Sequence, residues 1–512
     1  MPPLVQLVTV DCPNPSLQDN TGDIDRLKKN VTEKCGNSVV VPYGAMAKVA
    51  KAFRQAGFAG HAMVNDCGSH YELVDFLAAH PGILPAVALD LGTTHLEASL
   101  IDLMTGDVLG QANIANGQIA YGTDILTRIH FAATNHGLQT LQKAVVSSIN
   151  SLIAQLSSGA KISSAGIRAL AVSGNTTMVH FLLAVDPATL CREPYIPLVN
   201  SPDICHGADL GLTMNGLAPV WIMPSVGSYF GGDLISGIIA SGLDERSGPA
   251  MLIDVGTNAE VVLGNGEWLI ACAGAAGPAL EGGIAKMGMR AGPGAIDRVR
   301  IDADSGQLRY ETLGDGKPKG LCGSGIIDLV AALYLARMID VRGKFQKKFA
   351  GERLIDGPDG PAFVVVDGQE AADNQPITFA QVDLDAMMRS KAAMYSILTT
   401  LIAQVGLDFG DLEQIFVAGS FGKHIDPRQA ITLGMMPDLP LDVFRPIGNS
   451  SLAGAEEVLR SSEARKRCLK LPNKITYLEL NVNQEFMIRF SGCRFIPHTD
   501  PSLFPSVPIF SE

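Results

Sequence analysis

The chain has 512 residues, of which 47% are hydrophobic, and its formal net charge at pH 7 is −13. This hydrophobic content excludes a disordered chain, the length predicts two or three domains, and the acidic balance argues against a nucleic-acid partner. No apolar run is long enough to cross a bilayer, and the first residues lack the features of a secretion signal. The nine cysteines are scattered, without the close spacing of zinc or iron–sulfur sites. We therefore expect a cytoplasmic protein with no membrane partner.

Three parts are expected along the chain. Residues 1–84 contain a linker and a small N-terminal domain. The His-Pro-Gly sequence of residues 80–82, which favours a turn, indicates the end of this domain. Helical stretches then alternate with short apolar runs, as in an α/β fold, first over 85–249 and again over 250–512. The periodicity predicts helices over 45–57, 145–158, 324–338 and 384–405, the last with Asp383 as its N-cap, and a strand over 475–480.

Two segments of the chain share one pattern. Residues 87–94 and 251–258 are each an apolar strand that ends in Asp-x-Gly-Thr, and each is followed by a second strand-like run and a turn. This repetition predicts two β-hairpins and a duplicated domain. A glycine at the bend allows backbone N–H groups to approach an anion, and a carboxylate can hold a hydrated divalent cation. The predicted phosphate and Mg²⁺ residues are Asp90, Gly92, Thr93, Thr94, Asp254, Gly256, Thr257 and Asn258.

Three further turns join an apolar strand to a helix through small residues. Such turns leave backbone N–H groups free to face an anion, although many α/β turns of this kind bind no ligand. Asn175 lies in the first of them, Gly323 and Ser324 in the second, and Gly419 and Ser420 in the third. We expect the third turn to border the adenosine of a nucleotide.

Asp233 follows two glycines at the start of a predicted helix. It is either a catalytic group that orients the attacking water near a γ-phosphate, or an ordinary acid in the first turn of a helix. Cys272 has no His or Asp beside it and is expected to be a buried structural thiol. His95 and His424 lie near the ends of the proposed pocket, and neither is assigned a role.

Two such hairpins facing each other resemble the nucleotide site of the actin-like, sugar-kinase and heat-shock-chaperone ATPases. The expected fold is therefore α/β, with a duplicated ribonuclease-H-like (actin-like ATPase) core and a small N-terminal α/β domain. The resemblance implies that ATP and Mg²⁺ bind, with Asp90 and Asp254 as the metal ligands. The first ATPase lobe would cover 85–249 and the second 250–512.

Four longer sequence segments restrict the resemblance to one family. They are the Gly- and Ala-rich run over 272–296, the Leu-Cys-Gly-Ser-Gly-Ile-Ile-Asp of 321–328, the Ile-Gly-Asn-Ser-Ser-Leu-Ala-Gly-Ala of 447–455, and the Phe-Ile-Pro-His-Thr-Asp of 495–500. Together they are similar to the reductive activators of corrinoid proteins, which use ATP to return Co(II) corrinoid to Co(I). The resemblance implies a corrinoid-protein partner and a homodimer.

Members of that family usually carry an iron–sulfur domain before the linker. Cys12, Cys35 and Cys67 are too widely spaced in sequence for a cluster loop. We therefore expect no iron–sulfur cluster in this chain and a separate iron–sulfur protein as the electron donor.

Other functions remain open on the same core. A small-molecule kinase would need a base near the γ-phosphate, for which Asp233 is the candidate. A binding module would use the nucleotide only to switch its affinity for a partner. A degenerate ATPase ranks last, because Asp90, Thr93, Asp254 and Thr257 are all present.

Overall fold

The computed structural model divides the chain into two compact units. The first unit contains Met1–Ala240 and Ser451–Asn473, and the second contains Ser241–Ser450 and Lys474–Glu512. The structure describes residues 2–256, 258–274, 285–302, 305–314, 316–358, 360–480 and 483–510, without the side chains of residues 420, 421 and 423.

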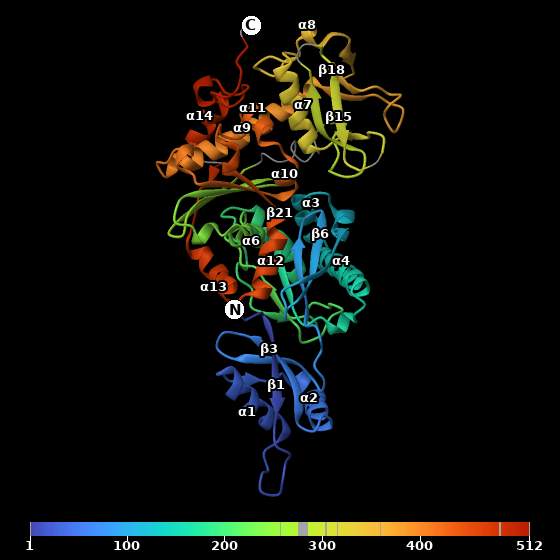
Figure 1. The fold of residues 1–512 in the computed structure, drawn as a ribbon, viewed down its shortest axis with the longest axis vertical. Coiled ribbons are helices and arrows are strands. Elements are labelled where there is room, and N and C mark those ends of the chain that lie inside the picture. Colours follow the sequence, from blue (N-terminus) through green and yellow to red (C-terminus); the bar gives the residue numbers. More distant parts are fainter. Residues whose placement is uncertain are drawn as a thin grey trace. The chain divides into compact units, whose positions relative to one another are not determined.

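A four-stranded sheet with two helices forms the N-terminal part of the first unit, drawn in blue in Figure 1. Its strand order is β1-β3-β4-β2, and its core includes Phe53 and Leu27, which are almost fully buried. The elements are β1 (Val5–Asp11), α1 (Asp23–Cys35), β2 (Val39–Val40), α2 (Tyr43–Gln55), β3 (Ala59–Asp66) and β4 (Tyr71–Leu77). A buried ion pair between Asp75 of β4 and Arg168, 2.8 Å apart, joins this sheet to the rest of the unit.

The rest of the first unit is built on a six-stranded sheet of order β7-β6-β5-β8-β10-β9. Strands β5, β6 and β7 pair antiparallel, whereas β8 pairs parallel with both β5 and β10. The strands are β5 (Pro85–Leu91), β6 (His95–Asp102), β7 (Val108–Ala115), β8 (Leu170–Gly174), β9 (Cys205–His206) and β10 (Pro219–Ile222).

The second unit repeats the order of five of these strands, and its sixth strand lies at the opposite edge of the sheet. Its sheet runs β21-β20-β11-β12-β13-β22, with β11, β12 and β13 antiparallel and β20 parallel to both β11 and β21. The strands are β11 (Ala250–Val255), β12 (Ala259–Gly264), β13 (Leu269–Gly274), β20 (Gln414–Ala418), β21 (Phe444–Gly448) and β22 (Ile475–Tyr477). Three antiparallel strands followed by two parallel ones occur in both units, so the predicted duplication and both predicted hairpins are confirmed.

Helices cover both sheets. In the first unit they are α3 (Ile125–Ala132), α4 (Gly137–Gly159), α5 (Thr176–Leu183), α6 (Gly232–Ser241), α12 (Ser450–Arg460) and α13 (Ser462–Lys470). In the second they are α7 (Gly323–Leu335), α8 (Lys347–Ala350), α9 (Gln381–Gln404), α10 (Gly419–His424), α11 (Pro427–Thr432) and α14 (Gln484–Gly492). No helix in the described ranges is both long and apolar enough to cross a membrane.

Two small three-stranded sheets complete the second unit. One has the order β15-β14-β16 and the other β17-β18-β19. Their strands are β14 (Ala295–Ile301), β15 (Leu308–Thr312), β16 (Gly320–Leu321), β17 (Leu354–Gly357), β18 (Gly360–Val366) and β19 (Ile377–Ala380).

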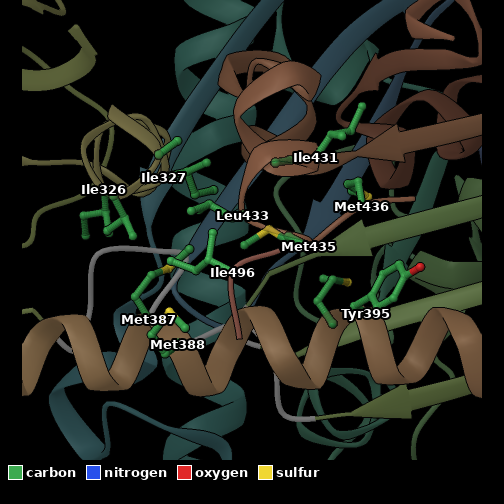
Figure 2. Packing of buried hydrophobic residues seen from close by; sticks show 14 of the residues in the cluster. Ile326, Ile327, Met387, Met388, Tyr395, Ile431, Leu433, Met435, Met436 and Ile496 are labelled. Carbon is green, nitrogen blue, oxygen red and sulfur yellow. The ribbon is translucent and has the colours of Figure 1, made fainter. Parts of the chain in front are cut away.

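The core of the second unit gathers around α9. Figure 2 shows Met387, Met388 and Tyr395 of this helix among buried side chains of α7, α11 and the chain near Ile496. These side chains are at most 4% exposed. Methionine side chains adapt to irregular gaps, which suits a helix that is buried on most of its faces.

Some predicted elements differ from the structure at their ends. Asp383 is not the N-cap of α9: it lies at the third helical position, where its carboxylate accepts the N–H of Ala380, the actual N-cap, at 3.0 Å. A carboxylate at either position neutralises free N–H groups at the helix start, so the sequence signal was real but displaced by three residues. The predicted strand over 475–480 ends at Tyr477, where its pairing with β13 stops.

Candidate nucleotide site

The turn of the β5–β6 hairpin lies at the end of a buried strand. A Cβ at Gly92 would lie 2.3 Å from the carbonyl oxygen of His95, so the turn closes only around glycine. The side chain of Asn116 donates to the carbonyl of Gly92 at 3.0 Å, and its backbone N–H donates to that of Thr94 at 2.8 Å. These bonds hold the Gly-Thr-Thr backbone in one shape.

Asn175 joins this turn from the neighbouring strand. It follows β8, and its Oδ1 accepts the N–H of Met178 at 2.9 Å as the N-cap of α5. Its Nδ2 donates to the hydroxyl of Thr93 at 3.0 Å. Two of the residues predicted from separate motifs are therefore in direct contact, because β5 and β8 are adjacent parallel strands whose carboxyl ends share one edge.

Asp90 is the second-last residue of β5, and a row of serine hydroxyls leads to its carboxylate. The hydroxyl of Ser451 on α12 donates to Oδ1 of Asp90 at 2.7 Å. Ser173 of β8 lies 2.8 Å from Ser451, and Ser236 of α6 donates to Ser173 at 2.7 Å. None of these serines was among the site residues predicted from the sequence. Ser451 could have been identified from its place in the 447–455 segment. No sequence signal identified Ser236, because a serine inside an apolar helix has no distinctive spacing.

Asp233 approaches the same place from the first turn of α6. Burial raises the pKa of its carboxyl to about 6, and the negative charge of Asp90 also favours the protonated form, against a lowering by the N–H of Leu234. A Cβ at Gly231 would lie 2.6 Å from Oδ1 of Asp233 and 2.3 Å from Cα of Asn175. The start of α6 is therefore packed directly against the start of α5.

Mg²⁺ and phosphate fit this arrangement. Carboxylate oxygens are the ligands that Mg²⁺ prefers, and it usually keeps several waters when one or two carboxylates hold it. Asp90 supplies such oxygens in the first unit, beside a turn whose backbone and threonine hydroxyls can face phosphate, and Asp254 supplies them in the second. Burial is the main cause of the raised pKa of Asp233 and the charge of Asp90 adds to it, so a cation beside Asp90 would offset only this second contribution.

The hairpin of the second unit has the same design. Asp254 is the second-last residue of β11, and the N–H of Gly256 donates to the carbonyl of Asn258 at 2.9 Å across the turn. Thr257, predicted to contact phosphate, lies outside the described residues. In the repeated sequence pattern, Thr257 corresponds to Thr93.

Gly419 lies beside the Asp254 carboxylate. It begins α10 directly after β20, with φ of +76°, a left-handed conformation that favours glycine. A Cβ there would lie 3.3 Å from Oδ1 of Asp254 and 3.2 Å from the carbonyl of Val255. The predicted third turn and the second hairpin are thus neighbours. The side chain of Ser420 is outside the described part.

Gly323 and Ser324 begin α7, with Cys322 as its N-cap. The Cys322 thiol and the Ser324 hydroxyl are 3.2 Å apart, and the thiol also donates to the carbonyl of Ile296 at 3.2 Å. Helix α7 contacts α10, so this helix start and the Gly419 turn belong to neighbouring elements. Cys272 is fully buried and burial raises the pKa of its thiol, as predicted for a structural cysteine.

Comparison with known proteins gives three consecutive family matches. Residues 1–80 match the RACo linker region, 85–246 the RACo middle region, and 248–508 the C-terminal domain of RACo, the ASKHA domain. The corrinoid activation enzyme RamQ of Eubacterium limosum is 31% identical over 453 residues, which cover 86% of this chain and 75% of RamQ. A reductase of Methanosarcina barkeri, named for a Co(II) methylated-amine-specific corrinoid protein, is 25% identical over 76% of this chain and 72% of its own length.

A solved structure agrees with these matches. The reductive activator for corrinoid, iron–sulfur protein superposes with a TM-score of 0.90 at 38% identity, covering 99% of this chain and 81% of that one. The expected fold class, an ASKHA or actin-like ATPase core, is thereby confirmed. With family matches along nearly its whole length, the chain belongs to the RACo family, whose named relatives are activators of corrinoid proteins.

Proposed function

We propose that this protein is an ATP-dependent reductive activator of a corrinoid protein. It would bring the cobalt of a bound corrinoid partner from Co(II) to Co(I), with one electron from a separate iron–sulfur donor and with hydrolysis of ATP to ADP and phosphate. The single observation that carries the proposal is the match along nearly the whole chain to an activator of a corrinoid protein.

The nucleotide is proposed to bind at the two hairpins. Asp90 and Asp254 would hold the hydrated Mg²⁺, and the turns that follow them would contact phosphate through Gly92, Thr93, Thr94, Gly256, Thr257 and Asn258. The contact between Asn175 and Thr93 supports a role for Asn175 in the same turn. Gly419 and Ser420 would border adenosine, and Gly323 and Ser324 would lie near phosphate or ribose.

Asp233 is proposed to orient the attacking water. A carboxyl whose pKa lies near 6 can accept and return a proton close to neutral pH, as general acid–base work requires. Bound Mg²⁺ would stabilise negative charge on the phosphates, and it would also lower the pKa of Asp233 by offsetting the charge of Asp90.

ATP is needed because reduction to Co(I) is uphill. For a one-electron step, 59 mV corresponds to about 1.4 kcal/mol. Two conformations of the activator that differ by roughly 5 kcal/mol in their preference for the reduced over the oxidised partner would shift the effective reduction potential of the cobalt by about 200 mV. Hydrolysis would reset the activator for the next partner.

The test is an anaerobic absorption spectrum of a Co(II) corrinoid protein mixed with this protein, a one-electron donor and Mg²⁺-ATP. We expect Co(I) to form with ATP and to be absent without nucleotide or with the Asp90→Asn variant. Hydrolysis of ATP without any change of cobalt state would contradict the proposal. Phosphate transfer to a small molecule would then favour the kinase alternative.

A further inference from the structure

We propose that Ser451 is a positioning residue for Asp90, so that helix α12 completes the Mg²⁺-nucleotide site of the first unit. The inference rests on the proposed function, because it assigns Asp90 to the metal. Its basis is the 2.7 Å hydrogen bond from the Ser451 hydroxyl to Oδ1 of Asp90. Ser451 is 7% exposed, so water competes little for this bond.

The hydroxyls that lead to Ser451 all donate toward Asp90. The single proton of the Ser451 hydroxyl goes to Asp90, so Ser173 must donate to Ser451, and Ser236 donates in turn to Ser173. Ser173 and Ser236 are fully buried. Hydrogen bonds that share a direction polarise one another, and this row ends on a carboxylate. The row therefore stabilises Asp90 as an anion in one rotamer, and the anion is the form that binds a hydrated cation.

A glycine on α12 makes this approach possible. A Cβ at Gly454 would lie 2.4 Å from the carbonyl oxygen of Ser236 and 2.5 Å from its Cα and Cβ. Helix α12 therefore packs against the backbone of α6 at the residue that begins the hydroxyl row. In Figure 1, α12 has the orange-red colour of residues near the C-terminus but lies near α6, among elements of the first unit.

The other end of α12 is fixed by the start of the chain. The N–H of Leu4 donates to the carbonyl of Leu459 at 2.8 Å, and the N–H of Ser462 donates to that of Pro2 at 2.9 Å. The buried Arg465 donates to the carbonyls of Val458 at 2.8 Å and Pro3 at 3.4 Å. Helix α12 cannot slide along its axis without breaking these bonds, so the position of Ser451 relative to Asp90 is set at both ends of the helix.

Two serines of α12 provide a matched comparison. Ser450 is 1% exposed, and its hydroxyl has no hydrogen-bond partner in the part of the chain that the structure describes. Ser451→Ala and Ser450→Ala thus remove the same buried atom from adjacent positions, but only the first removes a bond to Asp90. Any loss from packing or helix propensity should be similar in the two variants.

The experiment measures Mg²⁺ affinity in the full chain without the corrinoid partner. A fluorescent ADP analogue is held at a fixed concentration, and its binding is followed as Mg²⁺ is added. We expect the Mg²⁺ midpoint of Ser451→Ala to rise roughly 10- to 100-fold, the usual effect of removing a group that orients a metal ligand. Ser450→Ala should match the wild type. Ser236→Ala, which shortens the hydroxyl row by one member, should raise the midpoint by roughly two- to fivefold.

Three results would contradict the positioning role of Ser451 or the proposed nucleotide site on which it rests. Equal Mg²⁺ midpoints for Ser451→Ala and Ser450→Ala would overturn the positioning role, even if both variants bind the analogue. If Ser451→Ala fails to fold, an unchanged midpoint in Ser236→Ala has the same meaning. If the wild type binds no Mg²⁺-dependent nucleotide, the proposed function itself fails, and this outcome is distinct because it appears before any substitution is made.

Discussion

Lys391 on α9 is a buried cation whose protonation should control the stability of the second unit. Its side chain is fully buried and donates to the carbonyl oxygens of Phe495 and Pro497 at 2.5 and 2.7 Å. Burial lowers the pKa of its ammonium group to about 7, against a smaller raising effect of Cys493. A neutral amine has two N–H groups, which match these two acceptors.

The direction of the pH dependence follows from linkage. The unfolded chain keeps Lys391 protonated up to its ordinary pKa of 10.5, whereas the folded chain releases the proton near pH 7. Between these values the unfolded state binds more protons, so the free energy of unfolding rises with pH, by about 1.4 kcal/mol per pH unit. From pH 7.5 to 9 the gain is about 2 kcal/mol, and below pH 7 the destabilising effect of the charged amine is fully present.

Urea unfolding at pH 7.5, 8.25 and 9 tests this in wild type and Lys391→Met, which cannot titrate. We expect the unfolding free energy of the wild type to increase relative to Lys391→Met by about 2 kcal/mol across this range. Arg389→Met, which removes an exposed charge from the same helix, controls for net charge and should follow the wild type. A difference between wild type and Lys391→Met that does not change with pH would refute the assignment of a neutral buried lysine.

Three further predictions concern the first unit and the thiols. Asp90→Asn should weaken Mg²⁺-dependent nucleotide binding at least tenfold while its thermal midpoint stays near that of the wild type, as measured by titration and calorimetry. Arg168→Met should lower the free energy of unfolding by about 3 kcal/mol, because it leaves Asp75 buried without this partner. In a double-mutant cycle measured by urea unfolding, adding Asp75→Asn should recover part of that free energy. Cys272 should react with iodoacetamide only after unfolding, as peptide mass spectrometry can show; reaction in the folded protein would contradict its burial.

The duplicated core could be predicted because its signals are local. Each Asp-x-Gly-Thr turn follows a fully apolar strand, and both hairpins formed where the pattern placed them. Asp426 and Pro427 occupy the N-cap and first position of α11, an arrangement that an Asp-Pro pair favours locally. Signals of this kind depend on a few neighbouring residues, so they can be recognised without knowledge of the tertiary contacts.

The serine row could not be predicted because it depends on contacts between distant segments. Ser451 and Asp90 are 361 positions apart in the sequence, and Ser236 reaches Ser173 only because α6 packs beside β8. The assignment of α12 and α13 to the first unit is equally non-local, since the expected lobe over 250–512 contains them in sequence. Hydrophobic periodicity predicts that a helix is buried, but it does not identify the sheet that buries it.

The proposed function requires that this protein use ATP to make Co(I). It is tested by the anaerobic absorption spectrum of a Co(II) corrinoid protein with this protein and a one-electron donor, recorded before and after addition of Mg²⁺-ATP. We expect the Co(II) band to be replaced by that of Co(I) only after ATP is added, and Asp90→Asn to abolish the change. A spectrum that stays Co(II) while ATP is hydrolysed would show that the protein is not a reductive activator.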